Sequence, residues 1–238
     1  MSEWAAKRFW NETSIVESDD GFAVVLDGRQ VKTPAKSPLL VPTRRYAEAV
    51  ASEWEAQQET IDPRTMPFTR TANAAIDKVR TQRHEVIDIL ADYGGSDLTC
   101  YRADSPESLV ERQVAAWNPL IDWATEAFGG RLVPTTGVMF APQDDEALAS
   151  LKVPVTQMSD FELAAFHDLV GLSGSLLIAL AATRGFAPLE ELWLRSRVDE
   201  LWQAEQWGAD EEAAEVVETK RQEFLHAGRV WNLVTARN

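Results

Sequence analysis

The stretch FAVVLDGRQVKT, residues 22–33, decides how the chain begins. Phe22–Leu26 is rich in residues that favour β-strands, and Gln30–Thr33 is a second run of the same kind. The Asp27-Gly28 pair between them is a strong hairpin signal, because glycine adopts a positive φ without steric cost. The stretch therefore predicts an antiparallel hairpin. A further short strand is expected at 39–41, and the prolines around it confine these strands to sheet edges or connections: Pro34, Pro38 and Pro42.

Beyond residue 42 the apolar residues take up helical spacing. Tyr46, Val50 and Trp54 recur every four residues, which predicts a helix that Thr43 caps. This helix should end before Asp62-Pro63, because the residue before a proline is pushed out of the α region. The same reasoning predicts helices at about 67–80, 82–93, 105–128, 143–151, 159–169, 172–184, 188–206 and 210–227, and short strands at 131–133 and 138–140.

These elements predict an α+β fold. A small β-rich N-terminal domain, residues 1–60, ends in a helix, and a larger, mostly α-helical C-terminal domain follows at 61–238. The position of the boundary is open between residues 54 and 101. With 238 residues the chain can bury one core or two modest ones.

Composition narrows the classes of function. The chain has 38 acidic and 23 basic residues and a net charge of −15, so we expect phosphate backbones to repel it and no nucleic-acid partner. Cys100 is the only cysteine, which excludes a disulfide scaffold and indicates a reducing compartment. The longest uncharged stretch, 169–183, is too short to span a membrane, and the first ten residues lack the features of a secretory signal or transit peptide. We therefore expect a cytoplasmic protein without membrane insertion.

The sequence lacks the motifs of catalysis and cofactor binding. It has no glycine-rich phosphate-binding loop, no nucleophile elbow and no zinc ligand set around its three histidines. We therefore expect no cofactor, no metal, no nucleotide and no enzymatic activity. One alternative stays open, an enzyme that acts on a small molecule or carbohydrate through paired carboxylates, since 38 acids offer many pairs. A purely structural subunit of a complex is the other alternative.

Two segments are candidate binding surfaces. The first contains Glu53-Trp54, and Trp54 continues the apolar stripe of its helix, so we expect it chiefly in the core. The second runs from Glu205 to Glu218 and holds six acids and no base. Acids favour the dipole at a helix start, so a solvated helix start is one interpretation. The other is an acidic docking surface with Trp202 and Trp207 as aromatic anchors.

Residues along almost the whole chain occur in an order typical of one family. They are Arg8-Phe9-Trp10, Leu26-Asp27-Gly28-Arg29, Lys32-Thr33-Pro34-Ala35, Glu53-Trp54, Gln57, Glu59, Met66-Pro67, Thr69, Ala74, Ile76-Asp77, Tyr93, Asp97, Cys100-Tyr101-Arg102, Gln113, Trp117, Pro119, Trp123, Ser196, Glu200, Gln203, Glu205 and Trp207-Gly208. Taken together, they make the chain resemble the Atp-twelve family, chaperones that assemble the catalytic head of ATP synthase. The family's architecture, a β-rich N-terminal domain and a helical C-terminal domain, agrees with the fold expected above.

The resemblance implies a partner and a mode of action. Such chaperones bind the unassembled α subunit of the head, cover the surface that it would present to the β subunit, and leave when β displaces them. Eukaryotic relatives work in mitochondria, whereas this chain fits a bacterial cytoplasm. The resemblance implies no nucleotide site.

The resemblance also implies where the partner binds. The family's acidic position after the Trp-Gly pair falls on Glu211 or Glu212. Two departures from the family pattern are Ala214-Glu215 in place of a His-Asp pair and Ser173-Gly174-Ser175 in place of a Lys-Ser-Leu run, which puts a contact through that lysine in doubt. The candidate partner-binding residues are Glu211, Glu212, Asp210, Trp207, Trp202, Glu205, Trp54 and Glu53.

Overall fold

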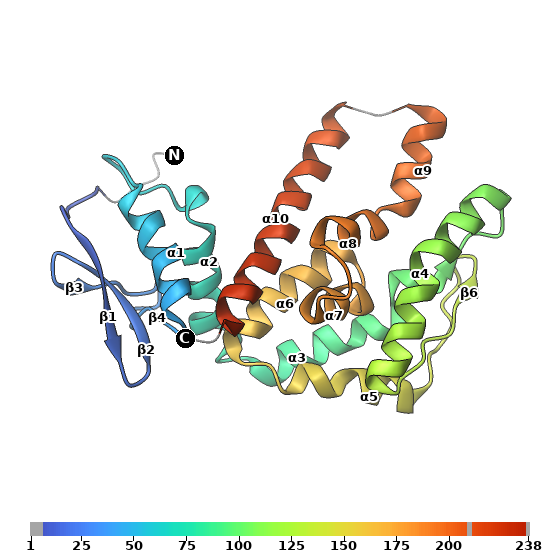
Figure 1. Ribbon diagram of the computed structural model, residues 1–238, viewed down its shortest axis with the longest axis horizontal. Helices are drawn as coiled ribbons and strands as arrows, with labels where there is room; N and C mark the ends of the chain where they lie inside the picture. Colours follow the sequence, from blue (N-terminus) through green and yellow to red (C-terminus); the bar gives the residue numbers. More distant parts are fainter. Residues whose placement is uncertain (1–6, 209–210, 237–238) are drawn as a thin grey trace. The chain divides into compact units, whose positions relative to one another are not determined.

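The computed structural model describes residues 7–208 and 211–236, with only the backbone of Glu211 (Figure 1). The chain divides into two compact units. Unit 1 comprises Met1–Arg83, Ser159–Ala165 and Arg229–Asn238, and unit 2 comprises His84–Met158 and Phe166–Gly228. Short strands lie near the N-terminus and helices form most of the rest, which confirms the predicted α+β class.

A small antiparallel sheet opens unit 1. Its strands are β1 (Thr13–Ser18), β2 (Gly21–Leu26), β3 (Arg29–Gln30) and β4 (Leu40–Val41), and β2 pairs with each of the others. The pairing of Leu26 with Arg29 confirms the predicted two-residue turn, in which Asp27 and Gly28 have φ of 46° and 78°. Sequence analysis did not single out β1, whose side chains are half-buried or exposed and therefore carry a weak apolar pattern.

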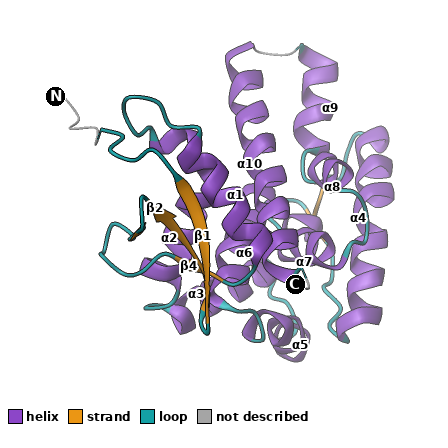
Figure 2. Cartoon of the chain, turned by 60° about the vertical axis from the view of Figure 1, so that its left-hand side comes forward, coloured by secondary structure: helices purple, strands orange, loops and turns teal. Residues whose placement is uncertain are grey.

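Helix α1 (Arg44–Glu55) packs on this sheet (Figure 2). Thr43 caps it as predicted, because its hydroxyl accepts a hydrogen bond from the Tyr46 N–H at 3.1 Å. A 3-10 turn, η1 (Pro63–Thr65), leads into α2 (Pro67–Ala74) and a π-helical segment, η2 (Ala75–Val79). The Tyr46 hydroxyl donates to the Phe68 carbonyl at 3.1 Å. These contacts keep α2 with α1 in unit 1, whose first segment ends at Arg83. The expected domain boundary at 60/61 stays a prediction, because the two compact units are not continuous in sequence.

Glu53 fixes the start of α2. Its carboxylate accepts hydrogen bonds from the N–H groups of Phe68 at 2.6 Å and Thr69 at 2.8 Å, and from the Thr69 hydroxyl at 2.7 Å. These donors satisfy a side chain that is only 8% exposed. Burial raises the pKa of Glu53, and the hydrogen bonds from Thr69 and Phe68 act in the opposite direction. Glu53 therefore has a structural role within unit 1, and its assignment as a partner contact stays a prediction.

Unit 2 is predominantly helical. No helix in the described part of the chain is long and apolar enough to cross a membrane. Three of the helices below, α3, α6 and α10, have residues in both units. The elements are α3 (Arg83–Asp92), η3 (Tyr93–Ser96), η4 (Leu98–Cys100), β5 (Tyr101–Arg102), α4 (Glu107–Phe128), β6 (Thr135–Thr136), α5 (Asp145–Thr156), α6 (Asp160–Ser173), α7 (Leu176–Arg184), α8 (Leu189–Arg195), α9 (Val198–Trp207) and α10 (Glu211–Thr235).

The core of unit 2 includes α7, in which Leu176–Ala181 are all buried. A buried carboxylate, Asp97, fixes the start of this helix. It accepts hydrogen bonds from the Ser175 hydroxyl at 2.8 Å and the Leu177 N–H at 3.1 Å, and from Thr99 through both its N–H and its hydroxyl. The Ser173-Gly174-Ser175 segment, where a lysine run was expected in relatives, thus supplies part of this internal network.

The predicted helix at 188–206 is two helices, α8 and α9. The chain breaks at Ser196-Arg197, where the Ser196 hydroxyl donates back to the Trp193 carbonyl at 2.7 Å. The indole of Trp117, on α4, donates to the Arg195 carbonyl at 2.7 Å. Because this carbonyl bonds to a distant side chain, a continuous helical pattern in the sequence does not produce a continuous helix.

The strands predicted at 131–133 and 138–140 are wrong. Only Thr135–Thr136, between them, forms a strand, β6, which pairs in parallel with β5. The two apolar runs suggested strands because apolar β-branched residues favour sheets. Val133, Val138, Met139 and Phe140 are instead exposed, and the pairing of β6 with β5 involves only Thr135 and Thr136 of this segment.

We expect the difference in stability between the wild type and the Glu53→Gln variant to depend on pH, because the variant lacks the buried carboxyl. Because the pKa of Glu53 is raised above its ordinary 4.5, the folded protein holds this proton more tightly than the unfolded chain does. The free energy of unfolding of the wild type, relative to the variant, should therefore fall as the pH rises from 4.5 through the raised pKa. Denaturant unfolding of both proteins across this range measures the difference.

Glu48→Gln is the matched control, because Glu48 is exposed on the same helix and its replacement changes the net charge equally. Subtracting its effect leaves the contribution of the buried carboxyl. A wild-type advantage that stays constant or grows with pH would contradict the assignment.

Candidate partner-binding surface

Several predicted residues lie in the C-terminal half of α9 and the first turns of α10. We call Leu201–Trp207 and Glu212–Glu218 the helix tip; Figure 1 shows it where α9 ends and α10 begins. None of the ten residues of α9 is buried. Trp207 is 74% exposed, and its ring meets that of Trp202 edge-on, with centroids 5.7 Å apart. The predicted tryptophans thus form one aromatic cluster, in which Trp202 is half-buried and Trp207 is exposed.

Carboxylates are also part of the helix tip. Glu205 forms an ion pair with Arg112 of α4 at 2.7 Å, and the hydrogen bond from Arg112 lowers the pKa of Glu205. Glu212 and Glu215 are exposed on the first turns of α10. Asp210 and the Glu211 side chain lie outside the described residues. Ion pairs this exposed add little to stability, so we interpret the charges of the tip as available for recognition.

The helix tip also exposes aliphatic side chains that sequence analysis did not select. Leu201, Val216 and Val217 are 42%, 52% and 37% exposed. The two adjacent valines within the acidic run are the signal in the sequence for this exposed apolar surface. Exposed apolar groups with a charged rim are typical of protein-binding surfaces.

Further along α10 the acids are held by an arginine. Glu218 accepts hydrogen bonds from Arg221 and Gln222, which lower its pKa to about 2. Arg221 also bonds to Glu190 of α8 at 2.6 Å. This part of the acidic run therefore serves to join α10 to α8.

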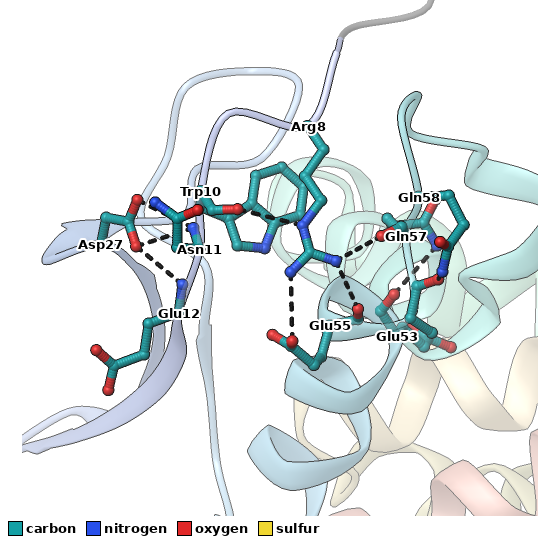
Figure 3. A network of polar contacts seen from close by, with 10 residues as sticks. Arg8, Trp10, Asn11, Glu12, Asp27, Glu53, Glu55, Gln57 and Gln58 are labelled. Atoms are coloured by element: carbon teal, nitrogen blue, oxygen red, sulfur yellow. Dashed lines mark hydrogen bonds and ion pairs between the residues drawn. The ribbon is translucent and has the colours of Figure 1, made fainter.

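The Glu53-Trp54 segment belongs to the interior of unit 1. Trp54 is half-buried and meets Trp10 edge-on at 5.4 Å between ring centroids, and Trp10 is 3% exposed. Figure 3 shows Arg8 beside Trp10: its guanidinium donates to the carbonyls of Glu55 at 2.8 Å and Gln57 at 2.6 Å. Several residues that carried the family resemblance thus build the fold, whereas the helix tip faces solvent.

The described residues contain no group of three or more His, Cys, Asp or Glu side chains placed to hold a metal ion. Burial raises the pKa of Cys100 to about 12, so this thiol stays protonated and is a poor nucleophile. A cavity of about 470 Å³ in unit 2 is lined by Trp123, Ala127, Phe128, Ser150, Val153, Pro154, Gln157 and Arg184. None of these eight side chains is acidic, so the cavity does not offer the paired carboxylates of the enzyme alternative.

Comparison with known proteins places the chain in a family. Residues 7–125 match the model of the ATP12 chaperone protein family. The crystal structure of Atp12 from Paracoccus denitrificans is 46% identical, with a TM-score of 0.94 over 98% of this chain and 100% of that one. A candidate chaperone from Agrobacterium tumefaciens is 39% identical, with a TM-score of 0.90 over 96% of this chain and 86% of that one.

A more distant relative is the mitochondrial protein atp12 of Schizosaccharomyces pombe. It is 23% identical over 222 residues, which are 88% of this chain and 76% of the yeast protein. The ordered residues, the two-unit α+β fold and these matches agree with one another, and the chain belongs to the ATP12 chaperone family.

Proposed function

We propose that this chain, an ATP12-family chaperone of ATP synthase assembly, binds the unassembled α subunit of the catalytic head and keeps it from aggregating. The helix tip is the observation that carries the proposal, because it exposes Trp207, which stacks edge-on against the half-buried Trp202, together with aliphatic side chains that proteins usually bury. Family membership supports the chaperone class. The identity of the client and the manner of its release are our inference.

The composition of the tip suits a client that must later be released. Trp202 and Trp207 supply rigid apolar area of the kind that dominates binding energy at interfaces. Glu212 and Glu215 would attract arginine or lysine on the client, which speeds encounter and disfavours wrong partners more than it strengthens the complex. The net charge of −15 acts in the same direction over longer distances.

Release would follow from competition. The sequence has no phosphate-binding loop, so we expect that nucleotide hydrolysis does not drive release of the client. A β subunit that covers the same surface of α displaces the chaperone if its contacts with α are stronger. The chaperone thus serves as a temporary substitute for β.

We expect Trp207→Ala to weaken binding of isolated α subunit by about tenfold or more, because it removes an exposed aromatic anchor. The free energy of unfolding should change little, since the side chain is 74% exposed. Biolayer interferometry with purified α measures the affinity, and denaturant unfolding checks the fold. Phe9→Ala, which removes an aromatic ring that is 62% exposed in unit 1, is the control. Equal affinities for wild type and Trp207→Ala would remove the tip from the binding surface.

Glu212→Lys should slow association with α, and the loss should diminish at high salt, because charges at an interface act mainly on the encounter. Glu126→Lys, an exposed site on α4, makes the same change of charge away from the tip. Association rates of both variants at low and high salt separate the local effect from that of net charge. If the two variants slow association equally, the position of Glu212 does not matter.

We expect purified β subunit to displace the chaperone from a preformed complex with α, whereas ATP alone should not. Size-exclusion chromatography of the mixtures shows which chains travel together, and light scattering of α alone or with the chaperone shows whether aggregation is prevented. Release by ATP hydrolysis without β would falsify the competition mechanism. A chaperone that stays at fixed stoichiometry in finished ATP synthase would indicate a structural subunit instead.

A further inference from the structure

An uncharged apolar segment of unit 2 remains outside the function described so far. Residues 132–143, LVPTTGVMFAPQ, contain no charged side chain in a chain that is 26% charged. Within it Val138, Met139 and Phe140 are 92%, 80% and 69% exposed, and Val133 is 60% exposed. We call Val133–Phe140 the apolar loop. Three consecutive large apolar side chains at such exposure form a patch rather than the scattered apolar residues of an ordinary surface.

The base of the apolar loop is firmly attached to unit 2. The Val133 N–H donates to the side-chain oxygen of Gln143 at 2.7 Å, and the Gln143 amide donates back to the Val133 carbonyl at 3.0 Å. Leu132, next to this pair, is completely buried. The Gly137 N–H donates to the Arg102 carbonyl at 2.8 Å, directly after the β5–β6 pairing. These bonds hold both sides of the loop.

Arg102, whose carbonyl accepts the hydrogen bond from Gly137, is itself held in place. Arg102 is 8% exposed; its guanidinium donates to the Thr99 carbonyl at 2.8 Å and to Asn118 at 3.0 Å, and it lies 5.0 Å from the centroid of the Trp117 ring. The chain then turns at Gly137, whose φ of +87° disfavours other residues. These bonds thus hold the backbone next to Val138–Phe140 in place. A patch whose backbone is already fixed loses less conformational freedom on binding.

The absence of charge in the apolar loop, together with the net charge of the chain, determines which partner can bind it. A second copy of this chain brings another net charge of −15, and the loop has no basic residue to offset the repulsion. Its four exposed apolar side chains also fall short of the about 800 Å² per partner that a stable dimer buries. An anionic membrane is disfavoured by the same charge. An uncharged, apolar surface of another protein is complementary to the loop.

We propose that Val138, Met139 and Phe140 dock on an uncharged apolar patch of the unassembled α subunit, as a second contact beside the helix tip. This inference rests on the proposed function and names a further part of its surface. Unit 2 carries both contacts, and α4 is joined to each: Arg112 pairs with Glu205 of the tip, and Asn118 accepts from Arg102 below the loop. Two modest contacts on one unit hold a client firmly and still yield to a stronger competitor.

The test compares a variant that removes the apolar character of Val138, Met139 and Phe140 with one that keeps it. A polar variant carries Val138→Ser, Met139→Ser and Phe140→Ser, and an apolar variant carries Val138→Ile, Met139→Leu and Phe140→Leu. Ile89→Ser, at an apolar position of α3 that is 49% exposed, is the control for loss of surface apolarity. The affinity for purified α subunit, aggregation of α by light scattering and the unfolding midpoint are measured for all of them.

The polar variant should bind α about tenfold or more weakly, with a correspondingly shorter lifetime of the complex, because apolar contacts act mostly on dissociation. The apolar variant and Ile89→Ser should bind like the wild type. Unchanged unfolding midpoints are expected, since the replaced side chains are exposed.

Failure of this inference differs from failure of the proposed function. If the wild type binds α and the polar variant binds equally well, the loop is not a contact, while the function stands. If the wild type does not bind α, both fall. Sedimentation velocity and flotation with anionic vesicles test the other occupants: self-association or vesicle binding that only the polar variant loses would assign the loop to a second copy or a membrane and overturn the proposal.

Discussion

The rest of unit 2 depends on the buried carboxylate of Asp97. It accepts four hydrogen bonds, two from Thr99 and one each from the Ser175 hydroxyl and the Leu177 N–H. Asp97 accepts the Leu177 N–H, and the Ser175 hydroxyl, which donates to Asp97, accepts the Ile178 N–H, so the two side chains together satisfy the first N–H groups of α7 inside the core. Burial raises the pKa of Asp97 and the bonds oppose that effect, so the site tolerates the carboxylate only as long as its partners stay in place. Glu53 does the same for α2 in unit 1.

This arrangement separates the residues that build the fold from the exposed residues that we propose as partner contacts. Arg8, Trp10, Glu53 and Asp97 are half-buried or buried, and each is engaged in contacts within its own unit. The exposed apolar groups lie elsewhere, at the helix tip and the apolar loop. A close-packed interior has no room for these apolar groups, so they stay in solvent. Exposed apolar groups of this kind suit a protein that covers the interface of another chain.

The acidic character of the chain complements these apolar contacts. Its net charge of −15 makes copies of the chaperone repel one another, which opposes self-association through the exposed tryptophan, methionine and phenylalanine. Charges at the rim of a contact guide encounter and orientation, while apolar area holds the complex. A surface divided in this way suits a partner that is bound early in assembly and given up later.

Local signals in the sequence by themselves determined the Asp27-Gly28 turn, the α1 helix behind its Thr43 cap and the α+β class, because turn geometry, capping and helical periodicity act over a few neighbouring residues. The ordered family residues also identified the family. They did not distinguish a buried carboxylate such as Glu53 from a binding one, because that role comes from donors on a later helix. Only the tertiary structure decided that α8 and α9 separate, where the Trp117 indole takes the Arg195 carbonyl, and that Val138–Phe140 stay exposed. Whether an apolar run is buried depends on what surface the rest of the chain places over it, and the run itself does not carry that information.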